Sequence, residues 1–137
     1  MDDFGQDKEF IEEEVVNIIC AAIHSVFGIK AKYESSEQIL VETVVENDKD
    51  RLILQGINYN KEKATSWCSQ LIDQVIRGLL KLGKPFKYVI TCVMQQNNSA
   101  GMNTFGCGFF EESDGSVSKS IAINDLYFAI TIFAVLI

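Results

Sequence analysis

The side chains of this chain that could act as nucleophiles or metal ligands include four cysteines and one histidine. Cys20, Cys68, Cys92 and Cys107 lie 48, 24 and 15 residues apart, so no C-x-x-C pair marks a zinc or redox site. Each cysteine falls in an apolar stretch, which is typical of small buried thiols in a reducing compartment. We therefore predict no metal site and no cofactor.

His24 is the only histidine that could serve as a general base. It lies beside Ile23 and Val26 in a helical pattern, where a partly buried structural histidine is the favoured interpretation. A catalytic dyad of His24 with Cys92 or Cys107 would require the two side chains to meet in space. A small thiol enzyme is kept as an alternative function, and a lowered thiol pKa would favour it.

Glycines and glutamates give no stronger sign of catalysis. Gly101, Gly106 and Gly108 do not form the G-x-x-x-x-G-K-S/T pattern of a phosphate-binding loop, and no helix is predicted after them. The glutamates at 12–14 and 111–112 are consecutive, so they point in different directions and are interpreted as solvated surface charge. We predict that the protein is not an enzyme.

Charge and hydropathy exclude two classes of partner. The net charge of -7 argues against a nucleic-acid partner, because such binding needs a basic surface. The apolar run at residues 126–137 is twelve residues long, whereas a spanning helix needs about 20, so no membrane insertion is predicted. The start of the chain is acidic and lacks an apolar signal region. A cytoplasmic protein is expected.

Hydrophobic periodicity predicts the elements that must position these residues. Apolar residues at three- and four-residue spacing predict one helix from about Ile11 to Gly28 and a second from the N-cap Asn60 to Gly83. Strand-like runs follow at residues 86–96, 102–111, 116–123 and 126–136, divided by turn clusters. This order predicts an α+β fold with two helices packed on one face of a four-stranded antiparallel meander.

The segment between the helices is less regular. Residues 38–45 and 51–54 are β-prone and flank the polar turn at residues 46–50, so a small extra hairpin and a mobile loop are equally compatible with it. The strand at 102–110 is also unusual, because glycine in a strand often marks close approach by another backbone. It is either an internal strand with a bulge or an edge or exchanged strand against which a partner chain lies.

Several local patterns resemble the Tctex-type dynein light chain family. One of them is the run LGKPFKYVITCVMQ at residues 82–95, which resembles a sequence motif of this family. In it, Gly83 and Pro85 end a helix and a strand begins directly after them. Trp67, the turn at residues 97–101, the Asp114-Gly115 turn and the apolar strand at 127–137 are similar to family features in the same order. The resemblance covers residues 59–137 and the first helix.

The resemblance implies a single domain over residues 1–137, with an atypical insertion at about 31–56. It implies a non-catalytic, strand-exchanged homodimer that binds the dynein intermediate chain by β-strand addition, in motor assembly and cargo attachment for microtubule-based transport. Trp67, Tyr88 and Ile90 are expected to support the dimer core. The peptide groove and the exchanged strand are expected at Met102, Asn103, Thr104, Phe105, Gly106, Cys107, Gly108, Phe109 and Phe110.

Two points of the resemblance leave alternatives open. The Gly106-Cys107-Gly108 run departs from the small polar residues that are more usual in the exchanged strand, so peptide selectivity is not predicted. A dimeric peptide-binding adaptor of the same fold, working independently of dynein, is the alternative within this class. The expected location is the cytoplasm, associated with the cytoskeleton through a cytoplasmic or axonemal dynein.

Overall fold

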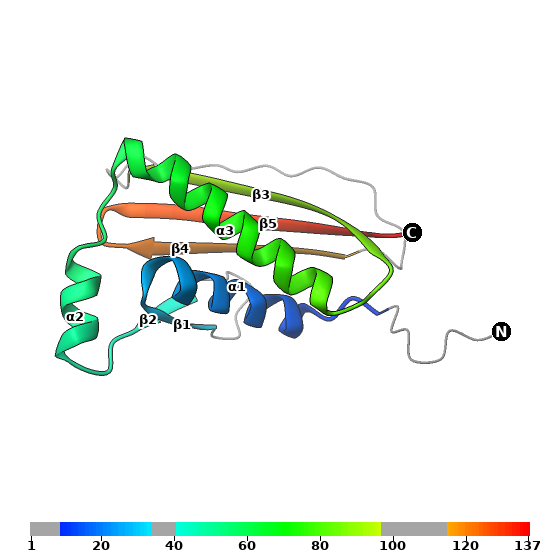
Figure 1. Ribbon diagram of the computed structural model, residues 1–137, viewed down its shortest axis with the longest axis horizontal. Helices are drawn as coiled ribbons and strands as arrows, with labels where there is room; N and C mark the ends of the chain where they lie inside the picture. Colours follow the sequence, from blue (N-terminus) through cyan, green and yellow to red (C-terminus); the bar gives the residue numbers. More distant parts are fainter. Residues whose placement is uncertain (1–8, 34–40, 97–114) are drawn as a thin grey trace.

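The computed structural model describes residues 9–33, 41–96 and 115–137. Two long helices, α1 (Glu12–Phe27) and α3 (Lys61–Lys81), lie across the same face of an antiparallel sheet (Figure 1). The sheet contains β3 (Phe86–Gln96), β4 (Gly115–Ile123) and β5 (Leu126–Leu136). A hairpin of β1 (Lys30–Tyr33) and β2 (Val41–Val44), and the short helix α2 (Asp48–Gln55), connect α1 to α3. The predicted mixed architecture, with helices on an antiparallel sheet, is confirmed.

The strand order of the sheet is β3-β5-β4, which corrects the predicted meander. In a meander each strand would pair with the next along the chain, but β3 pairs with β5 over its full length, from Phe86↔Leu136 to Gln96↔Leu126. The strands predicted at 86–96, 116–123 and 126–136 are confirmed within one residue. The strand predicted at 102–111 lies outside the described residues.

The tight turn between β4 and β5 was predicted correctly at Asn124-Asp125. Asn124 has a φ of 53°, a left-handed conformation that asparagine tolerates better than most residues. This turn sets Ile123 opposite Leu126 and so fixes the register of the hairpin. Because β5 pairs with β4 on one side and with β3 on the other, it lies in the centre of the described sheet. This position suits its sequence, which is apolar on both faces except for Thr131.

Helix α1 forms and ends for local reasons. Its first turn holds three glutamates, whose charge the helix dipole favours there. The helix stops at Gly28, which has a φ of 76° and donates its N–H to the carbonyl of His24. The predicted end of the first helix is therefore confirmed. Its buried face consists of Val15, Val16, Ile19, Ala22, Ile23 and Phe27.

Helix α3 carries both of its predicted end signals. The Asn60 side chain accepts hydrogen bonds from the N–H groups of Glu62 and Lys63, at 2.9 and 3.2 Å. Gly83, with a φ of 67°, follows the last turn. Lys84 then turns back to α1, where its Nζ lies 2.8 Å from Glu14 and its side chain is only 5% exposed.

Close packing of α1 on α3 depends on one glycine. A Cβ at Gly78 would lie 2.6 Å from Cγ2 of Ile18, so any larger residue there would push the helices apart. Beneath the helices, the core is filled by alternate residues of the strands. Its largest fully buried apolar side chains on the strands are Ile121, Ile123, Leu126, Phe128, Ile130 and Ile132.

The segment between the long helices contains a hairpin, but not the one expected around the polar turn at residues 46–50. β1 pairs with β2 from Lys30↔Val44 to Tyr33↔Val41. Residues 51–54, predicted as β-prone, belong to helix α2 instead. The whole described structure therefore has three helices and a separate two-stranded sheet, rather than two helices on one sheet.

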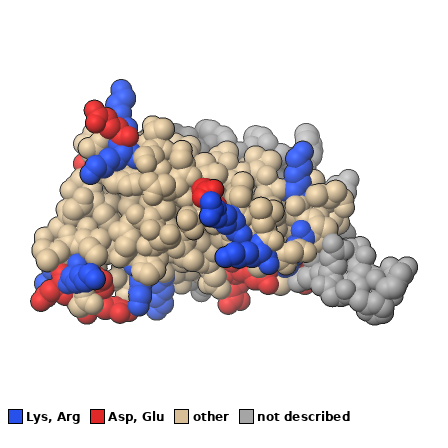
Figure 2. Space-filling model, in the orientation of Figure 1, with Lys and Arg blue, Asp and Glu red and all other residues tan. Residues whose placement is uncertain are grey.

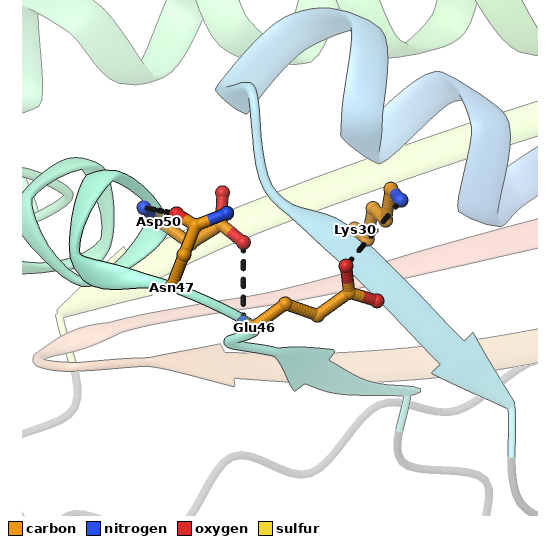
Figure 3. Close-up of polar contacts among 4 residues, drawn as sticks. All are labelled: Lys30, Glu46, Asn47 and Asp50. Carbon is orange, nitrogen blue, oxygen red and sulfur yellow. Dashed lines mark hydrogen bonds and ion pairs between the residues drawn. The ribbon is translucent and has the colours of Figure 1, made fainter.

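A local polar network explains why α2 is helical (Figure 3). The Asn47 side chain accepts a hydrogen bond from the Asp50 N–H at 2.9 Å, which caps the first turn. The Asp50 carboxylate accepts a hydrogen bond from the Glu46 N–H at 3.2 Å, and the Glu46 side chain pairs with Lys30 of β1 at 3.7 Å. The cap and these contacts override the strand propensity of Leu52 and its neighbours.

Within the described parts of the chain, no helix has the length and apolar character needed to cross a membrane.

Candidate functional site

The predicted peptide-binding strand, Met102 to Phe110 with Cys107, lies outside the described residues. The structure does place the two strands that the chain joins through it. β3 ends at Gln96, opposite Leu126, and β4 begins at Gly115, opposite Ala134. Because β3 and β4 are both antiparallel to β5, they run parallel to each other. The connecting residues, 97–114, therefore join opposite ends of the sheet.

The three residues predicted to support a dimer core lie in the layer between α3 and the sheet. The Trp67 ring packs on Phe27 of α1, with ring centroids 5.2 Å apart. Tyr88 and Ile90 pair with Ala134 and Ile132 of β5 and share the inward face of that buried isoleucine. All three side chains are partly buried against the core, so they reinforce the helix-to-sheet contact.

The opposite face of the sheet carries neither α1 nor α3, and apolar side chains alternate on it with polar ones such as Lys87, Thr91 and Thr131. We call it the helix-free face, defined by the side chains of Val89, Val93, Tyr127, Phe133 and Val135. Val89 pairs with Phe133 in register, and Lys87 pairs with Val135. The exposed fractions of Val89, Val93 and Val135 are 50, 43 and 44%. Three valines half exposed on neighbouring strands form an apolar surface of the kind that partner chains cover.

A hollow of about 390 Å³ opens between the first half of α3 and the last residues of β3. Its walls are mainly apolar, with three hydroxyl-bearing residues and one lysine. The lining residues are Tyr59, Lys61, Ala64, Thr65, Cys68, Ser69, Ile72 and Met94. The described residues contain no cluster of three or more possible metal ligands. The chemistry of this hollow suits an apolar or thiol-reactive group rather than a cation.

Two side chains of the β4–β5 turn fix the end of the sheet near this hollow. The Asp125 carboxylate accepts hydrogen bonds from the Tyr59 N–H at 2.7 Å and from Nε2 of Gln96 at 3.3 Å. The Asn124 amide donates to the carbonyls of Leu54 and Ile57, both at 2.7 Å. Sequence reasoning identified the turn but not these contacts, because the partners lie 29 to 70 residues away.

Lys119 is a buried charged residue that was not predicted from the sequence. It lies on the inward face of β4 with its side chain fully buried, and its Nζ contacts a Glu12 oxygen at 3.0 Å. The same Nζ lies 4.5 Å from the centroid of the Tyr33 ring in β1. The only available signal was alternation, since Lys119 occupies the inward position between Val117 and Ile121. This lysine joins β4, α1 and the hairpin.

Cys20 and Cys92 have the opposite electrostatics from a catalytic nucleophile. Burial, together with the neighbouring Cys68 thiol, raises the pKa of Cys92 well above its ordinary value. Burial also raises the pKa of Cys20, an effect that the charge of Lys119 partly offsets. His24 is exposed near the end of α1. A thiol nucleophile needs a lowered pKa, so Cys92 does not have the properties of one.

Figure 2 shows the charged side chains of the helix-covered face gathered in small mixed groups, with uncharged surface between them. On this face no extended basic area is available to follow a phosphate backbone.

Comparison with known proteins supports the resemblance of the sequence to Tctex-type dynein light chains. The model of the Tctex-1 family matches residues 40–135. The chain is 25% identical to the dynein light chain Tctex-type of Drosophila melanogaster over 134 residues, which cover 97% of this chain and 96% of the relative.

Two further relatives have similar names. The dynein light chain Tctex-type 3 of Mus musculus is 31% identical over 86 residues, covering 62% of this chain and 74% of the relative. The dynein light chain Tctex-type of Dictyostelium discoideum is 25% identical over 104 residues, covering 73% and 94%. The match of the family model over most of the sheet and helix α3 shows that this chain belongs to the Tctex-1 family.

Proposed function

We propose that the protein is a non-catalytic dynein light chain that works as a homodimer. In this role it binds an extended segment of the dynein intermediate chain by strand addition and takes part in motor assembly and cargo attachment for microtubule-based transport in the cytoplasm. The family membership and the names of the relatives support the dynein role. The proposal treats residues 1–137 as one domain, with the hairpin and α2 as an insertion at about 31–56.

The single observation that carries the dimer is the helix-free face. Val89, Val93 and Val135 keep close to half of their surfaces exposed on two paired strands. Removing such surface from water contributes about 25 cal/mol for each Å² of apolar area. A second copy that places the same face against this one would cover the valines of both chains at once, as a two-fold interface requires.

The strand directions support an exchanged strand at residues 102–110. Their flanking positions lie opposite Leu126 and Ala134 of β5, which are roughly 26 Å apart at about 3.3 Å per residue. A strand that covers this distance from the end of β3 to the start of β4 runs antiparallel to both. It therefore has the direction needed to pair with an edge strand of its own sheet or of a partner's sheet.

Strand addition also explains the expected affinities. Each net ladder hydrogen bond contributes about 0.5–1.5 kcal/mol, and ordering a disordered peptide offsets part of that gain. One groove should therefore bind weakly to moderately. Two grooves on one dimer make the second capture intramolecular, which raises avidity by roughly 10²–10⁴ where the geometry allows both to engage.

The test is fluorescence anisotropy of a labelled N-terminal peptide of the dynein intermediate chain, titrated with the full chain, and oligomer mass measured on the same sample. Saturable binding to a dimer is the expected result. Phe105→Asp should weaken peptide binding or dimerisation, whereas the control Leu52→Asp, at a side chain of α2 that is 70% exposed, should leave both unchanged.

The other outcomes separate the parts of the proposal. A folded monomer would contradict the exchanged-strand dimer. A folded dimer without affinity for the peptide would contradict the intermediate-chain partner and favour an adaptor that works independently of dynein. Unchanged size and affinity in Phe105→Asp would contradict the assignment of the site to residues 102–110.

A further inference from the structure

Two free thiols from different elements lie together at the hollow between α3 and β3. Cys68 comes from α3 and Cys92 from β3, and Sγ of Cys68 lies 3.7 Å from the carbonyl oxygen of Cys92. The side chain of Cys92 points to the helix side of the sheet, because Cys92 pairs in register with the buried Ile130. The Cys68 sulfur therefore lies against the backbone of Cys92 at the helix-to-sheet contact, and the Cys68 thiol is near enough to contribute to the raised pKa of the Cys92 thiol.

We propose that Cys68 and Cys92 form an oxidisable thiol pair, which a hydroperoxide converts into an intrachain disulfide between α3 and β3. The inference uses the described residues alone and is independent of dynein binding. The α3–β3 pair is the reactive unit. The third described cysteine, Cys20, belongs to α1 and serves as an internal control.

The two thiols have different exposure, which assigns their roles. Cys68 lines a hollow of about 390 Å³, so a small peroxide can reach it. Cys92 does not line that hollow, and burial raises its thiol pKa. Since the thiolate is the form that attacks a peroxide, Cys68 reacts first and Cys92 resolves the product.

The chemistry balances with the hydroperoxide as the only oxidant. The Cys68 thiolate attacks one peroxide oxygen and the O–O bond breaks, which leaves Cys68 as a sulfenic acid and releases an alcohol or water. The Cys92 sulfur then attacks the Cys68 sulfur. The S–S bond forms, the S–O bond breaks, and the hydroxyl group leaves as water with the proton of Cys92. The two sulfurs together lose two electrons, and the peroxide gains two.

The product would join the first half of α3 to the last third of β3. A covalent link at this position closes the chain between residues 68 and 92 and restricts the unfolded state, so thermal unfolding should shift to a higher temperature. It would also hold the floor of the hollow in one shape. A reductant such as a dithiol should reverse both effects.

The test treats the full chain with hydrogen peroxide and analyses it without reduction by mass spectrometry. Wild type should lose two hydrogens, and a fragment with Cys68 should be joined to one with Cys92. Cleavage by trypsin after Lys63, Arg77 and Lys87 separates Cys68 from Cys20 and Cys92, and further cleavage after Met94 separates Cys92 from Cys107, so the partner can be assigned. Cys20→Ser should form the same link. Cys68→Ser and Cys92→Ser should abolish it, and Cys92→Ser should accumulate a sulfenic acid at Cys68 that dimedone traps.

A second measurement tests the pair without oxidation. Phenylarsine oxide bridges two thiols held close together, so its affinity should fall at least about 100-fold in Cys68→Ser or Cys92→Ser and stay the same in Cys20→Ser. Unchanged affinity in both pair variants would contradict the geometry. Oxidation of wild type to a sulfinic acid at Cys68 without a link, or a link to Cys20 or Cys107, would overturn the proposal.

Discussion

The two outer strands of the three-stranded sheet, β4 and β3, differ in what packs around them. We call these regions the β4 side and the β3 side. On the β4 side, β2 lies beside β4, and the fully buried Lys119 joins the strand to Glu12 and to the Tyr33 ring. On the β3 side, α3 leaves a hollow over the strand, and Val89 and Val93 are half exposed on the other face. The β4 side is filled by the chain itself, whereas the β3 side retains reactive and apolar groups.

The difference shows where this chain can change with least cost. Lys119 is fully buried whereas Glu12 is half exposed, so loss of the Glu12 carboxylate would leave an uncompensated charge in the core. A substitution at an exposed apolar side chain or at a hollow costs the folded chain little stability. The complex with a partner that covers such a surface is stabilised by removing that surface from water. The β4 side should therefore control folding, and the β3 side should control association and thiol chemistry.

The largest effect is expected from reversing the buried charge. Lys119→Glu places a second, buried carboxylate beside that of Glu12 and should lower the free energy of unfolding by about 3–5 kcal/mol. Lys119→Met removes the charge but keeps the apolar stem, so its cost should be below about 1.5 kcal/mol. Urea unfolding at fixed protein concentration measures both. Equal costs for the two variants would show that the charge is unimportant on the β4 side.

A charge on the helix-free face should act on association rather than folding. Val93→Asp would bury a carboxylate in the proposed dimer interface and should raise the dissociation constant at least about 100-fold. Leu80→Asp, at a side chain 68% exposed on α3, is the matched control and should leave dimerisation unchanged. Sedimentation equilibrium separates the two. Equal dimer strength in wild type and Val93→Asp would remove the β3 side from the interface.

Alkaline pH should weaken the folded state through the buried thiols. Burial raises the pKa of Cys92 above its ordinary value of 9.0, so the native state keeps the proton that the unfolded state loses. The stabilisation is complete below about pH 9 and is lost as pH rises, by up to about 1.4 kcal/mol per pH unit for one group. Thermal unfolding from pH 7 to 11 should show a shallower decline in Cys92→Ser than in Cys20→Ser or wild type.

The smallest effects compare two helix caps. Asn60→Ala and Asn47→Ala each remove a side-chain cap, at a cost of about 1 kcal/mol for its helix. α3 buries Leu71, Val75 and Leu79, whereas α2 has no buried residue. Loss of the Asn60 cap should therefore lower global stability, and loss of the Asn47 cap should speed hydrogen exchange only near α2. A global effect of Asn47→Ala would show that the hairpin segment is part of the main folding unit.

Local signals made much of the fold predictable. The Asn60 cap, the stops at Gly28 and Gly83 and the Asn124-Asp125 turn depend on neighbouring residues, and each was assigned correctly. Residues 51–54 were interpreted as β-prone, because side-chain type alone cannot show that the Asn47 cap starts a helix there.

The features that sequence reasoning missed depend on distant partners. The pairing of β3 with β5, the contact of Lys119 with Glu12 and the meeting of Cys68 with Cys92 join separate elements. Alternation can place Lys119 inward, but it cannot show which helix supplies the carboxylate. The resemblance to the family, in contrast, located a candidate strand at 102–110 that periodicity alone left with two interpretations.

The position of β5 has a consequence for the order in which the protein can fold. The central strand β5 follows both of its neighbours along the chain. During synthesis β3 therefore cannot pair with β5 until β4 and the β4–β5 turn have also been made. Contacts between residues as far apart as 86 and 136 also slow folding, because the chain must close a long loop first. During that delay β3 lacks its β5 partner, and β5 of another copy can compete for the same edge. Synthesis rate and local concentration should therefore affect how often two copies assemble while they fold.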